Sequence, residues 1–416
     1  MRVLWFANTP CNAVEHMKES TIGGGWLQTL DLHMQEKVEL HIAFYANWPE
    51  ETFTCRKATY HVIPSSSIRV SNVKNIFFPH VIHQEDTLRY LDIVNRVKPD
   101  LIHLHGTENA YGTMLSKVNV PVVVSIQGIM TPYAYRFGGD AAEDIQTYVG
   151  PANSSLKGML FEKGQKHTYD LLKLTAARET KYIRDVKYFI GRTIWDRRVS
   201  SVMSPGSHYF IGDEIMRDVF YTKQWNQGRV DGKWIIHTTA SDHPMKGFRT
   251  IVDTVNLLIS AGIQLEWRVA GLSAQSTVVR VAKKQLGKAY PLDHIKLLGR
   301  IGADALADMM AEANMFVLPS FMENSPNSLC EAMMMGMPCV ATNGGGTPSM
   351  LEDKVEGLLV QPRDPWAMAG AILELISDQE SAIAFGQAAR RTALKRHEPT
   401  RIVNQVFDAY QQILQA

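Results

Sequence analysis

The sequence predicts an α/β protein of two domains, each with a parallel sheet covered by helices. Short apolar runs alternate with longer amphipathic stretches from end to end, which is typical of strands joined by crossover helices. The chain has 416 residues, and single hydrophobic cores stop growing beyond about 250–300 residues. A polar stretch without periodicity, TKQWNQGRVDGK at 222–233, predicts a boundary near residue 228. We therefore expect domains at 1–228 and 229–398, followed by a terminal segment at 399–416.

Five strands are predicted in the first domain, because each run is short, rich in branched or aromatic residues and bounded by turn formers. Two helices fit between them, at Gly25–Lys37 and Thr87–Val97. The predicted strands are Val3–Ala7, Glu39–Tyr45, Leu101–His105, Val122–Ile126 and Tyr188–Gly191.

The second domain repeats the pattern. Phe248–Ser260 has apolar residues on one helical face, and Gly262 is expected to end this helix. Pro399–Ala416 has apolar residues at helical spacing, so this last helix is expected to pack back on the first domain. The predicted strands are Trp234–Thr238, Leu265–Ala270, Ile295–Leu298, Met315–Leu318, Pro338–Ala341 and Gly357–Val360.

Charge and cysteine usage exclude several classes of function. Lys and Arg number 43 against 42 Asp and Glu, so no overall field favours nucleic acid and no nucleic-acid partner is expected. The four cysteines form no Cys-x-x-Cys pair, which argues against a disulfide framework or a structural metal. The first apolar run is too short for a signal peptide, and no stretch approaches the length of a membrane span. A cytoplasmic location is expected.

The most informative stretch is PSFMENSPNSLCEAMMMGMPCVAT, residues 319–342, which reads as strand, loop, helix and strand. In open α/β sheets, ligands bind at loops that follow the carboxyl ends of strands. Ser325 and Pro326 are typical of a helix start, with a capping hydroxyl followed by proline at the first helical position. The backbone N–H groups of Asn327 and Ser328 would then be free to bind an anion such as a diphosphate.

Two carboxylates, Glu323 and Glu331, flank this predicted anion site. Carboxylates beside a phosphate suit hydrogen bonds from sugar hydroxyls, although a plain helix start with two solvated acids has the same spacing. The segment ENSPNSLCE resembles glycosyltransferase family 4, whose motif is Glu, seven residues and Glu. The resemblance implies that Glu323 contacts the donor sugar, that Glu331 contacts the nucleotide ribose, and that Asn324 belongs to the donor site.

Family 4 consists of retaining enzymes with the GT-B fold. The resemblance therefore implies two Rossmann-like doubly wound domains that face each other across a cleft, with the C-terminal helix crossing back to the first domain. The implied function is transfer of a sugar from a nucleotide-diphosphate sugar to an acceptor hydroxyl with retention, in bacterial surface polysaccharide or glycoconjugate synthesis. The implied acceptor is a carbohydrate or a lipid-linked oligosaccharide. No Asp-x-Asp occurs in the chain, so no metal and no other cofactor is expected.

Lys246 and Gly247 open a predicted helix after the first strand of the second domain. They resemble the family's Lys-Gly, whose lysine meets the leaving phosphate through charge-assisted hydrogen bonds; a solvated turn is the alternative. The family usually has an arginine five residues earlier, where this chain has Ser241. The cationic pair is therefore incomplete, and His243 and Arg249 are the candidates to compensate.

The first domain contributes two further candidates. The glycines at 23–25, with Gly24 and Gly25 at their end, resemble the family's glycine-rich loop that approaches the donor phosphate, although flexible turns also use such runs. Gln127 ends a strand where relatives frequently have a histidine near the reacting sugar. An amide cannot shuttle a proton near neutral pH, so Gln127 either positions a polar group or is a simple strand-end amide.

Two sets of residues at strand ends each have two possible interpretations. Gly271 and the pair Arg300–Ile301 resemble turns whose backbone meets the nucleobase in relatives, and ordinary turns are the alternative. His103 and His105 lie on one face of a predicted strand. Because no third ligand is nearby in the sequence, their spacing favours packing over metal binding.

From residue 157 to 198 the chain holds eleven Lys or Arg and five Asp or Glu, with aromatic residues interleaved. This excess suits an anionic acceptor or a peripheral contact with a membrane surface, and solvated basic faces on two ordinary helices are the plainer explanation. The segment GRTIWDRR resembles a stretch in the acceptor domain of some bacterial members of the family. The resemblance places Arg192 on the acceptor side, facing the cleft.

Under the resemblance, Lys246, the helix start at 325–328 and the loop at 23–25 stabilise the leaving diphosphate of an oxocarbenium-like transition state. Two alternatives stay open. A catalytically degenerate member that only binds a nucleotide sugar or a partner transferase is compatible with Ser241 and Gln127. A GT-B nucleotide-sugar epimerase needs acid–base residues in the cleft, which the lack of a histidine at 127 disfavours.

Overall fold

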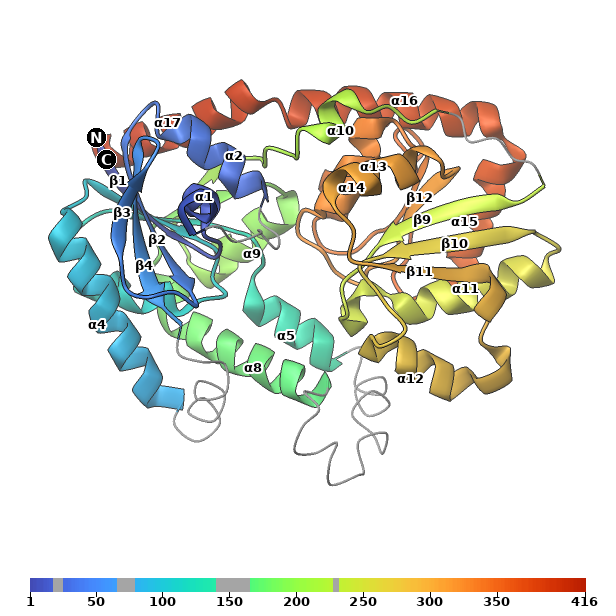
Figure 1. Cartoon of the computed structure of the whole chain (residues 1–416), viewed down its shortest axis with the longest axis horizontal. Helices are drawn as coiled ribbons and strands as arrows, with labels where there is room; N and C mark the ends of the chain where they lie inside the picture. The colour runs from blue at the N-terminus through green and yellow to red at the C-terminus, as the bar shows by residue number, and fades with distance from the viewer. Residues whose placement is uncertain (18–24, 66–78, 140–164, 227–231) are drawn as a thin grey trace.

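The computed structural model describes residues 1–17, 25–65, 79–139, 165–226 and 232–416. The chain forms two α/β domains, each with its own sheet, and the last two helices run along both domains (Figure 1). Every predicted strand forms, with ends that lie within one residue of the predictions. The α/β class and the doubly wound architecture are confirmed.

Eight strands make the first sheet, in the order β3-β4-β2-β1-β5-β6-β7-β8. Only β3 is antiparallel to its neighbour in this sheet. The chain order reverses between β1 and β5, and ligands bind at such switch points. The strands are β1 (Arg2–Ala7), β2 (Glu39–Ala46), β3 (Thr52–Cys55), β4 (Ala58–Pro64), β5 (Leu101–His105), β6 (Val122–Ser125), β7 (Tyr188–Gly191) and β8 (His208–Ile211).

The sequence does not predict β3, β4 or β8. Two of them, β3 and β8, are edge strands with partly or fully exposed residues, so they lack an apolar run. In β4, ATYHVIP, the buried positions include His61, and the strand ends in a proline. Polar residues in buried positions and a terminal proline conceal the strand signal.

Helices cover both faces of the first sheet. The best-defined start is that of α9, where the Thr193 hydroxyl accepts from the Asp196 N–H at 3.0 Å and the Asp196 carboxylate accepts from the Thr193 N–H at 3.2 Å. This reciprocal capping box satisfies two otherwise free donors. The helices are α1 (Val14–Met17), α2 (Gly25–Met34), α4 (Pro79–Val97), α5 (Met130–Gly139), α8 (Gln165–Tyr182) and α9 (Ile194–Met203), with the 3₁₀ helices η1 (Cys11–Ala13), η2 (Ala110–Lys117) and η4 (Ile183–Asp185).

The second sheet has six parallel strands in the order β11-β10-β9-β12-β13-β14. This is the 3-2-1-4-5-6 order of a Rossmann fold, in which ligands bind where the order reverses, here between β9 and β12. The strands are β9 (Trp234–Thr239), β10 (Leu265–Ala270), β11 (Ile295–Gly299), β12 (Met315–Leu318), β13 (Cys339–Thr342) and β14 (Leu358–Val360).

The helices of the second domain bury their apolar faces against this sheet. The predicted helix Phe248–Ser260 forms as α11, and Gly262 follows it with a φ of +82°. The helix α14 is buried along most of its length and packs mainly through methionines, whose flexible side chains fill irregular space. The bounds are α10 (Val219–Thr222), η5 (Pro244–Lys246), α11 (Phe248–Ser260), α12 (Thr277–Leu286), η6 (Gly287–Ala289), η7 (Leu292–His294), α13 (Ala303–Ala311), α14 (Asn327–Met335), η8 (Thr347–Ser349), α15 (Pro365–Ser377) and α16 (Gln379–Arg396).

The last helix, α17 (Pro399–Gln415), returns to the first domain, as the sequence predicts (Figure 1). It packs against α2, β7 and β8, and Ile402, Val406 and Ile413 join the core of that domain. Inside this core, the Tyr410 hydroxyl accepts from the Trp5 Nε1–H at 2.9 Å. The chain therefore crosses between the domains twice, before α10 and after α16.

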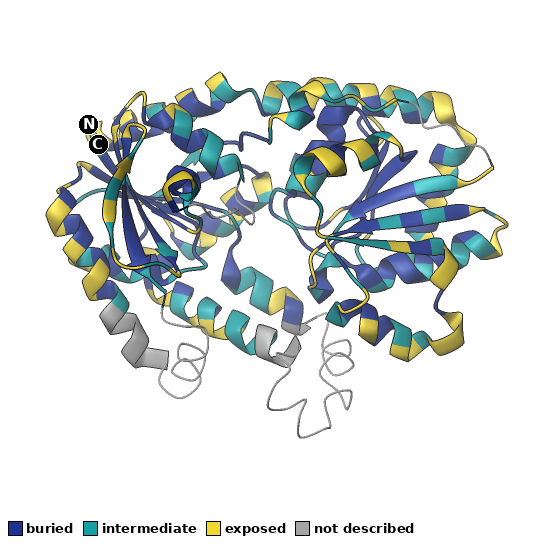
Figure 2. Ribbon diagram, in the orientation of Figure 1, coloured by how far each residue is buried: buried dark blue, intermediate teal, exposed yellow. Residues whose placement is uncertain are grey.

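Figure 2 shows buried strands inside both domains and exposed residues on the outer faces of the helices. Among the described helices, none combines the length and the apolar character needed to cross a bilayer. The predicted boundary near residue 228 falls in 227–231, outside the described residues.

Candidate active site between the two domains

The carboxyl ends of strands from both sheets meet at Asn324, in the loop after β12. This side chain is 2% exposed. Its amide group donates to Asp196 Oδ2 at 3.1 Å and to the Gln127 carbonyl at 3.3 Å, and its oxygen accepts from the Thr193 hydroxyl at 2.8 Å. Asn324, expected in the donor site, therefore links the loop that carries Glu323 to the first domain.

A second run of three glycines, at 344–346, holds this loop in place. A Cβ on Gly345 would lie 2.2 Å from the Glu323 carbonyl oxygen, and one on Gly346 would lie 2.0 Å from that of Asn324. Gly345 also has a φ of +62°, which side-chain-bearing residues rarely adopt. These glycines are not among the predicted site residues, although a triple glycine shortly after a predicted strand is a signal that could have indicated them.

The site contains the predicted pair of Lys246 and Glu323. Lys246 Nζ lies 2.5 Å from Glu323 Oε1, and the two side chains are 33% and 12% exposed. Gly247 places the lysine, because its φ is +73° and a Cβ would lie 2.1 Å from the Pro319 carbonyl oxygen. A partly exposed ammonium and a largely buried carboxylate thus face each other at the switch point of the second sheet.

Neither His243 nor Arg249 takes the place of the arginine that Ser241 replaces. His243 is an acceptor for the Met245 N–H, and burial, followed by the charge of Lys246, lowers its pKa to about 4, so it is neutral. Arg249 lies 2.8 Å from Asp253 Oδ2 and donates to Gln285. Both expectations of compensation are therefore wrong.

Glu331 lies on α14, 5% exposed, with one cationic partner. Arg217 donates to its Oε1 from Nη2 at 2.6 Å and from Nε at 3.0 Å. Burial raises the pKa of Glu331 to about 7, the charge of Arg217 opposes the rise, and Glu214 adds to it. Nothing in the sequence analysis indicates Arg217, because it lies outside every motif.

The start of α2 approaches the same pair. A Cβ on Gly25 would lie 3.4 Å from Cγ of Arg217. Gly25 is the first residue of α2, and no acidic residue stands in the first turn of this helix. The predicted loop residue Gly24 lies outside the described residues. The positive end of the α2 dipole is therefore directed toward the cation and carboxylate of the second domain.

The start of α14 differs from the prediction in one respect. The helix begins at Asn327 with the extended residue Pro326 before it, and no side chain caps it. Ser325, expected as the cap, instead directs its hydroxyl to Met350 Sδ at 3.4 Å. Asn327 and Ser328 are still the first two helical residues, so their N–H groups have no partner within the helix. The Asn327 Oδ1 is buried without a hydrogen-bond partner among the described residues.

On the first domain, Gln127 is half-buried and Arg192 is buried. The Gln127 Nε2 is buried without a partner in the described part of the chain. Arg192 is 8% exposed, lies 3.0 Å from Glu214 Oε1 and covers the Trp26 ring at 5.4 Å. The expectation that Arg192 faces a cleft is therefore wrong, because its charge is used in a buried ion pair.

The two candidate base-binding turns lie side by side at the ends of β10 and β11. The Gly271 N–H donates to the Gly299 carbonyl at 2.7 Å, and Gly271 has a φ of +92° with no room for a Cβ beside Ala240. Arg300 is exposed and Ile301 is half-buried. These residues lie together, on the β11 side of the switch point.

The two strand-end histidines are packed in the core. His103 is buried and contacts the Tyr410 hydroxyl at 2.5 Å and the Ser125 hydroxyl at 2.6 Å. The His105 ring lies tilted beside that of His103 and meets the Trp5 ring edge-on. Among the described residues, no group of three potential ligands is placed to hold a metal. The geometry supports the packing interpretation.

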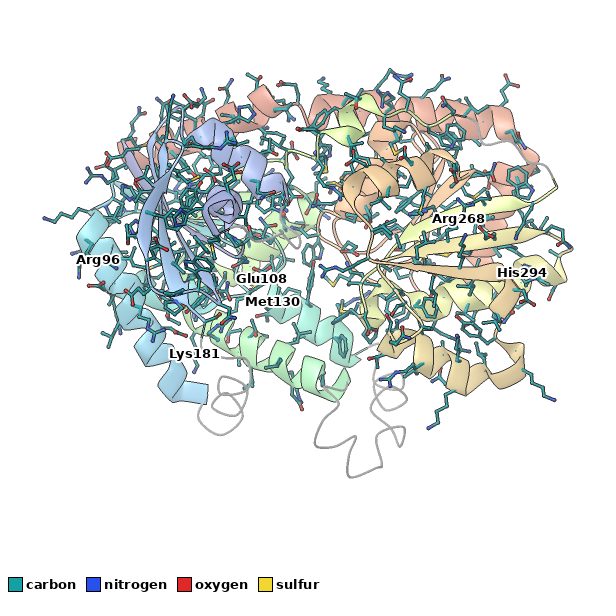
Figure 3. The ribbon with its side chains drawn as sticks, in the orientation of Figure 1. Arg96, Glu108, Met130, Lys181, Arg268 and His294 are labelled. Atoms are coloured by element: carbon teal, nitrogen blue, oxygen red, sulfur yellow. The ribbon has the colours of Figure 1, made fainter. Side chains whose placement is uncertain are left out.

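Two polar side chains of the first domain near the site have no sequence signal. Glu108 accepts from Asn8 Nδ2 at 2.9 Å and from the Gly128 N–H at 3.3 Å, and burial raises its pKa. Glu108 lies on the side of the domain that faces the second (Figure 3). Burial, followed by the charges of Glu323 and Glu108, raises the pKa of the Tyr133 phenol, so this side chain lies near enough to both carboxylates to feel their charge.

Comparison with known proteins relates the second domain to a family. Residues 232–378 match the family described as glycosyl transferases group 1. N-acetyl-alpha-D-glucosaminyl L-malate synthase of Bacillus anthracis is 29% identical over 122 residues, which are 29% of this chain and 32% of that protein. The amylovoran biosynthesis glycosyltransferase AmsK of Erwinia amylovora is 26% identical over 172 residues, 39% of this chain and 42% of that protein. The chain thus matches less than half the length of these relatives.

Solved structures resemble the chain over its whole length. Sucrose-phosphate synthase from Thermosynechococcus elongatus superposes with a TM-score of 0.73 at 14% identity, covering 99% of both chains. The Anabaena protein HepE, in complex with UDP and glucose, superposes with a TM-score of 0.64 at 14% identity, covering 99% of this chain and 100% of its own. Residues 232–378 therefore resemble the glycosyl transferases group 1, and the chain as a whole has the GT-B fold.

Proposed function

We propose that the protein is a retaining, metal-independent glycosyltransferase that moves a sugar from a nucleotide-diphosphate sugar to an acceptor hydroxyl. The observation that carries the proposal is the pair of Lys246 and Glu323 at the switch point of a sheet whose domain resembles the glycosyl transferases group 1. A lysine suits a departing phosphate, and a carboxylate suits a sugar hydroxyl. Retention is carried over from the resemblance to family 4.

Positive groups in the site support stabilisation of a leaving diphosphate. The starts of α2 and α14 each present free backbone N–H groups and a positive dipole end, and Lys246 adds a full charge. In this structure Lys246 pairs with Glu323. On binding, the ammonium would exchange part of this contact for a phosphate oxygen, while Glu323 accepts from the sugar. Such preorganised charge lowers the barrier without reorganisation at the moment of reaction.

The names of the relatives support the proposed donor and acceptor. HepE is in complex with UDP and glucose, so UDP-sugars are the first donors to test. AmsK is named for amylovoran biosynthesis, which supports a role in polysaccharide or glycoconjugate synthesis with a carbohydrate or lipid-linked oligosaccharide as acceptor. We assign the protein to the cytoplasm, with a peripheral contact at the membrane where the acceptor is lipid-linked.

A nucleotide-release assay tests the proposal. The purified chain is incubated with UDP-, GDP-, ADP- or CDP-sugars, with and without sugar acceptors, and free nucleotide is measured with and without EDTA. We expect release from one donor class, unaffected by EDTA. Lys246→Ala should slow release by about one to two decades, the loss of one charged contact in the transition state.

Lys284→Ala, an exposed lysine on α12 of the same domain, is the matched control and should release nucleotide at the wild-type rate. Binding of a nucleotide sugar without any release would contradict transfer. That result would favour the degenerate binder, which Ser241 and Gln127 also fit.

A further inference from the structure

Arg217 is the cation that contacts the buried carboxylate of Glu331 in this structure. Two of its nitrogens, Nε and Nη2, converge on one oxygen, Oε1, at 3.0 and 2.6 Å. Glu331 Oε2 has no hydrogen-bond partner among the described residues, so one oxygen of the carboxylate is fixed and the other is available as an acceptor. Double donation to one oxygen restricts rotation of the carboxylate more than a single ammonium would.

The position of Arg217 is fixed by the second domain. Its guanidinium covers the Phe220 ring at 4.9 Å. Phe220 and the neighbouring Met216 belong to the core that also contains Leu329 and Cys330 of α14. The arginine and the carboxylate therefore move as one body. A Cβ added to Gly25 would lie 3.4 Å from Arg217 Cγ, so the pair also lies near the start of α2, where the two domains approach each other.

We propose that Arg217 is a positioning residue of the donor site, which fixes Glu331 through Oε1 so that Oε2 accepts a hydrogen bond from a ribose hydroxyl of the nucleotide. The inference rests on the proposed function and adds to it a residue outside the family motif. Removing the arginine leaves a buried carboxylate that is free to rotate and to take up a proton. Both changes weaken a ribose contact.

The electrostatic surroundings of Glu331 give the proposal a distinctive signature. Arg217 and Glu214, both from the segment that joins β8 to α10, are the charged groups that act on this carboxylate, and Glu214 is itself paired with Arg192. On α16, packed along α14, Arg390 and Arg396 donate to backbone carbonyls. Because Arg217 opposes the rise in the pKa of Glu331, its removal raises that pKa further, and the carboxylate is then protonated at neutral pH.

The test measures binding of nucleoside diphosphates between about pH 6 and pH 9 by calorimetry. UDP, GDP, ADP and CDP are screened on the wild type, and the one that binds is compared with its 2′-deoxy form. We expect Arg217→Gln to bind the ribonucleotide roughly tenfold to a hundredfold more weakly at pH 7. The loss should shrink as the pH rises, because Glu331 ionises again. The affinity for the 2′-deoxynucleotide should change little in the variant.

Arg217→Lys should restore part of the affinity, since an ammonium still reaches Oε1. Arg249→Gln, which removes an arginine from another carboxylate pair of the same domain, should leave binding unchanged. The inference would be overturned if Arg217→Gln bound the nucleotide as tightly as the wild type does. It would also be overturned if the loss of affinity were the same at every pH and the same for the deoxynucleotide. Either result would leave the proposed function standing. Failure of the wild type to bind any of the four nucleotides would overturn both.

Discussion

At the scale of single residues, Glu331 shows how burial and pairing oppose each other. Its pKa is raised from 4.5 to about 7, so the folded protein holds this proton more tightly than the unfolded chain does. A raised acid pKa contributes stability that is present at low pH and is lost as the pH rises from about 4.5 to about 7. The ionised carboxylate therefore costs stability at neutral pH, which is a common property of functional sites.

Replacing this carboxylate by an amide should remove the pH dependence. In Glu331→Gln the amide oxygen still accepts from Arg217, but no charge is buried. We expect the variant to gain about 2 kcal/mol of unfolding free energy relative to the wild type between about pH 5 and pH 8. Urea unfolding at the two pH values measures the difference. A constant difference between the two proteins across this range would contradict the assignment of a raised pKa.

The glycine at 345 makes a second test of how one residue shapes the site. Gly345→Ala places a methyl group against the Glu323 carbonyl in a left-handed backbone, so we expect a loss of about 2 kcal/mol or more in stability and a fall in activity. Thermal unfolding and the nucleotide-release assay measure both. The control, Gly370→Ala, changes an exposed position of α15 with open space beside it and should be neutral or stabilising. If the two substitutions changed stability and activity equally, Gly345 would not be needed to hold the loop that carries Glu323.

Sequence reasoning finds residues that belong to a motif and misses those that three-dimensional proximity recruits. Glu323, Glu331 and Lys246 are identifiable because their spacing to strands and helices is local. Arg217 and Tyr133 reach the site from separate segments, so no local pattern marks them. The capping role of Ser325 fails because Pro326 adopts an extended conformation and the helix begins one residue later.

At the scale of elements, α17 belongs in sequence to the second domain and in packing to the first. Its Tyr410 hydroxyl contacts both Trp5 and His103 in the core of the first domain. The helical spacing of its apolar residues was sufficient to predict this helix and its destination. The edge strands β3 and β8 lack an apolar run because their residues are partly or fully exposed, and in the largely buried β4 the polar residue His61 and the terminal proline conceal the strand.

Tyr410→Phe should destabilise the first domain. The substitution keeps the ring but leaves the Trp5 and His103 ring nitrogens without this partner, so we expect a loss of about 1–3 kcal/mol. Tyr135→Phe, which removes an exposed hydroxyl from α5, should cost almost nothing. Thermal unfolding of both variants makes the comparison. Equal stability would mean that the hydroxyl of Tyr410 does not secure the helix.

At the scale of the whole molecule, a few polar contacts link the two domains beside the site. Asn324 reaches Thr193, Asp196 and Gln127, and the Arg396 guanidinium on α16 lies 2.9 Å from Asp213 in the first crossing segment. Domains that close over a substrate need contacts that form and break. Polar links of this kind are weaker and more reversible than an apolar interface.

Asn324→Asp should move the two domains apart, because a second carboxylate then faces Asp196 in a buried place. We expect a larger radius of gyration in small-angle X-ray scattering, and partial recovery when a nucleotide sugar is added. The exposed Asn404→Asp on α17 adds the same charge without this contact and should not change the dimensions. An unchanged radius for Asn324→Asp would show that this residue does not hold the domains together.

Donor binding at Glu331 is the central claim, and a thermal-shift panel tests it most directly. UDP-, GDP-, ADP- and CDP-sugars are added to the wild type and to Glu331→Ala. A donor present at a hundredfold excess over its dissociation constant adds about 2.7 kcal/mol of stability. The account predicts that one nucleotide class raises the unfolding temperature of the wild type and that the variant loses this response. Stabilisation of both proteins alike, or of neither, would contradict it.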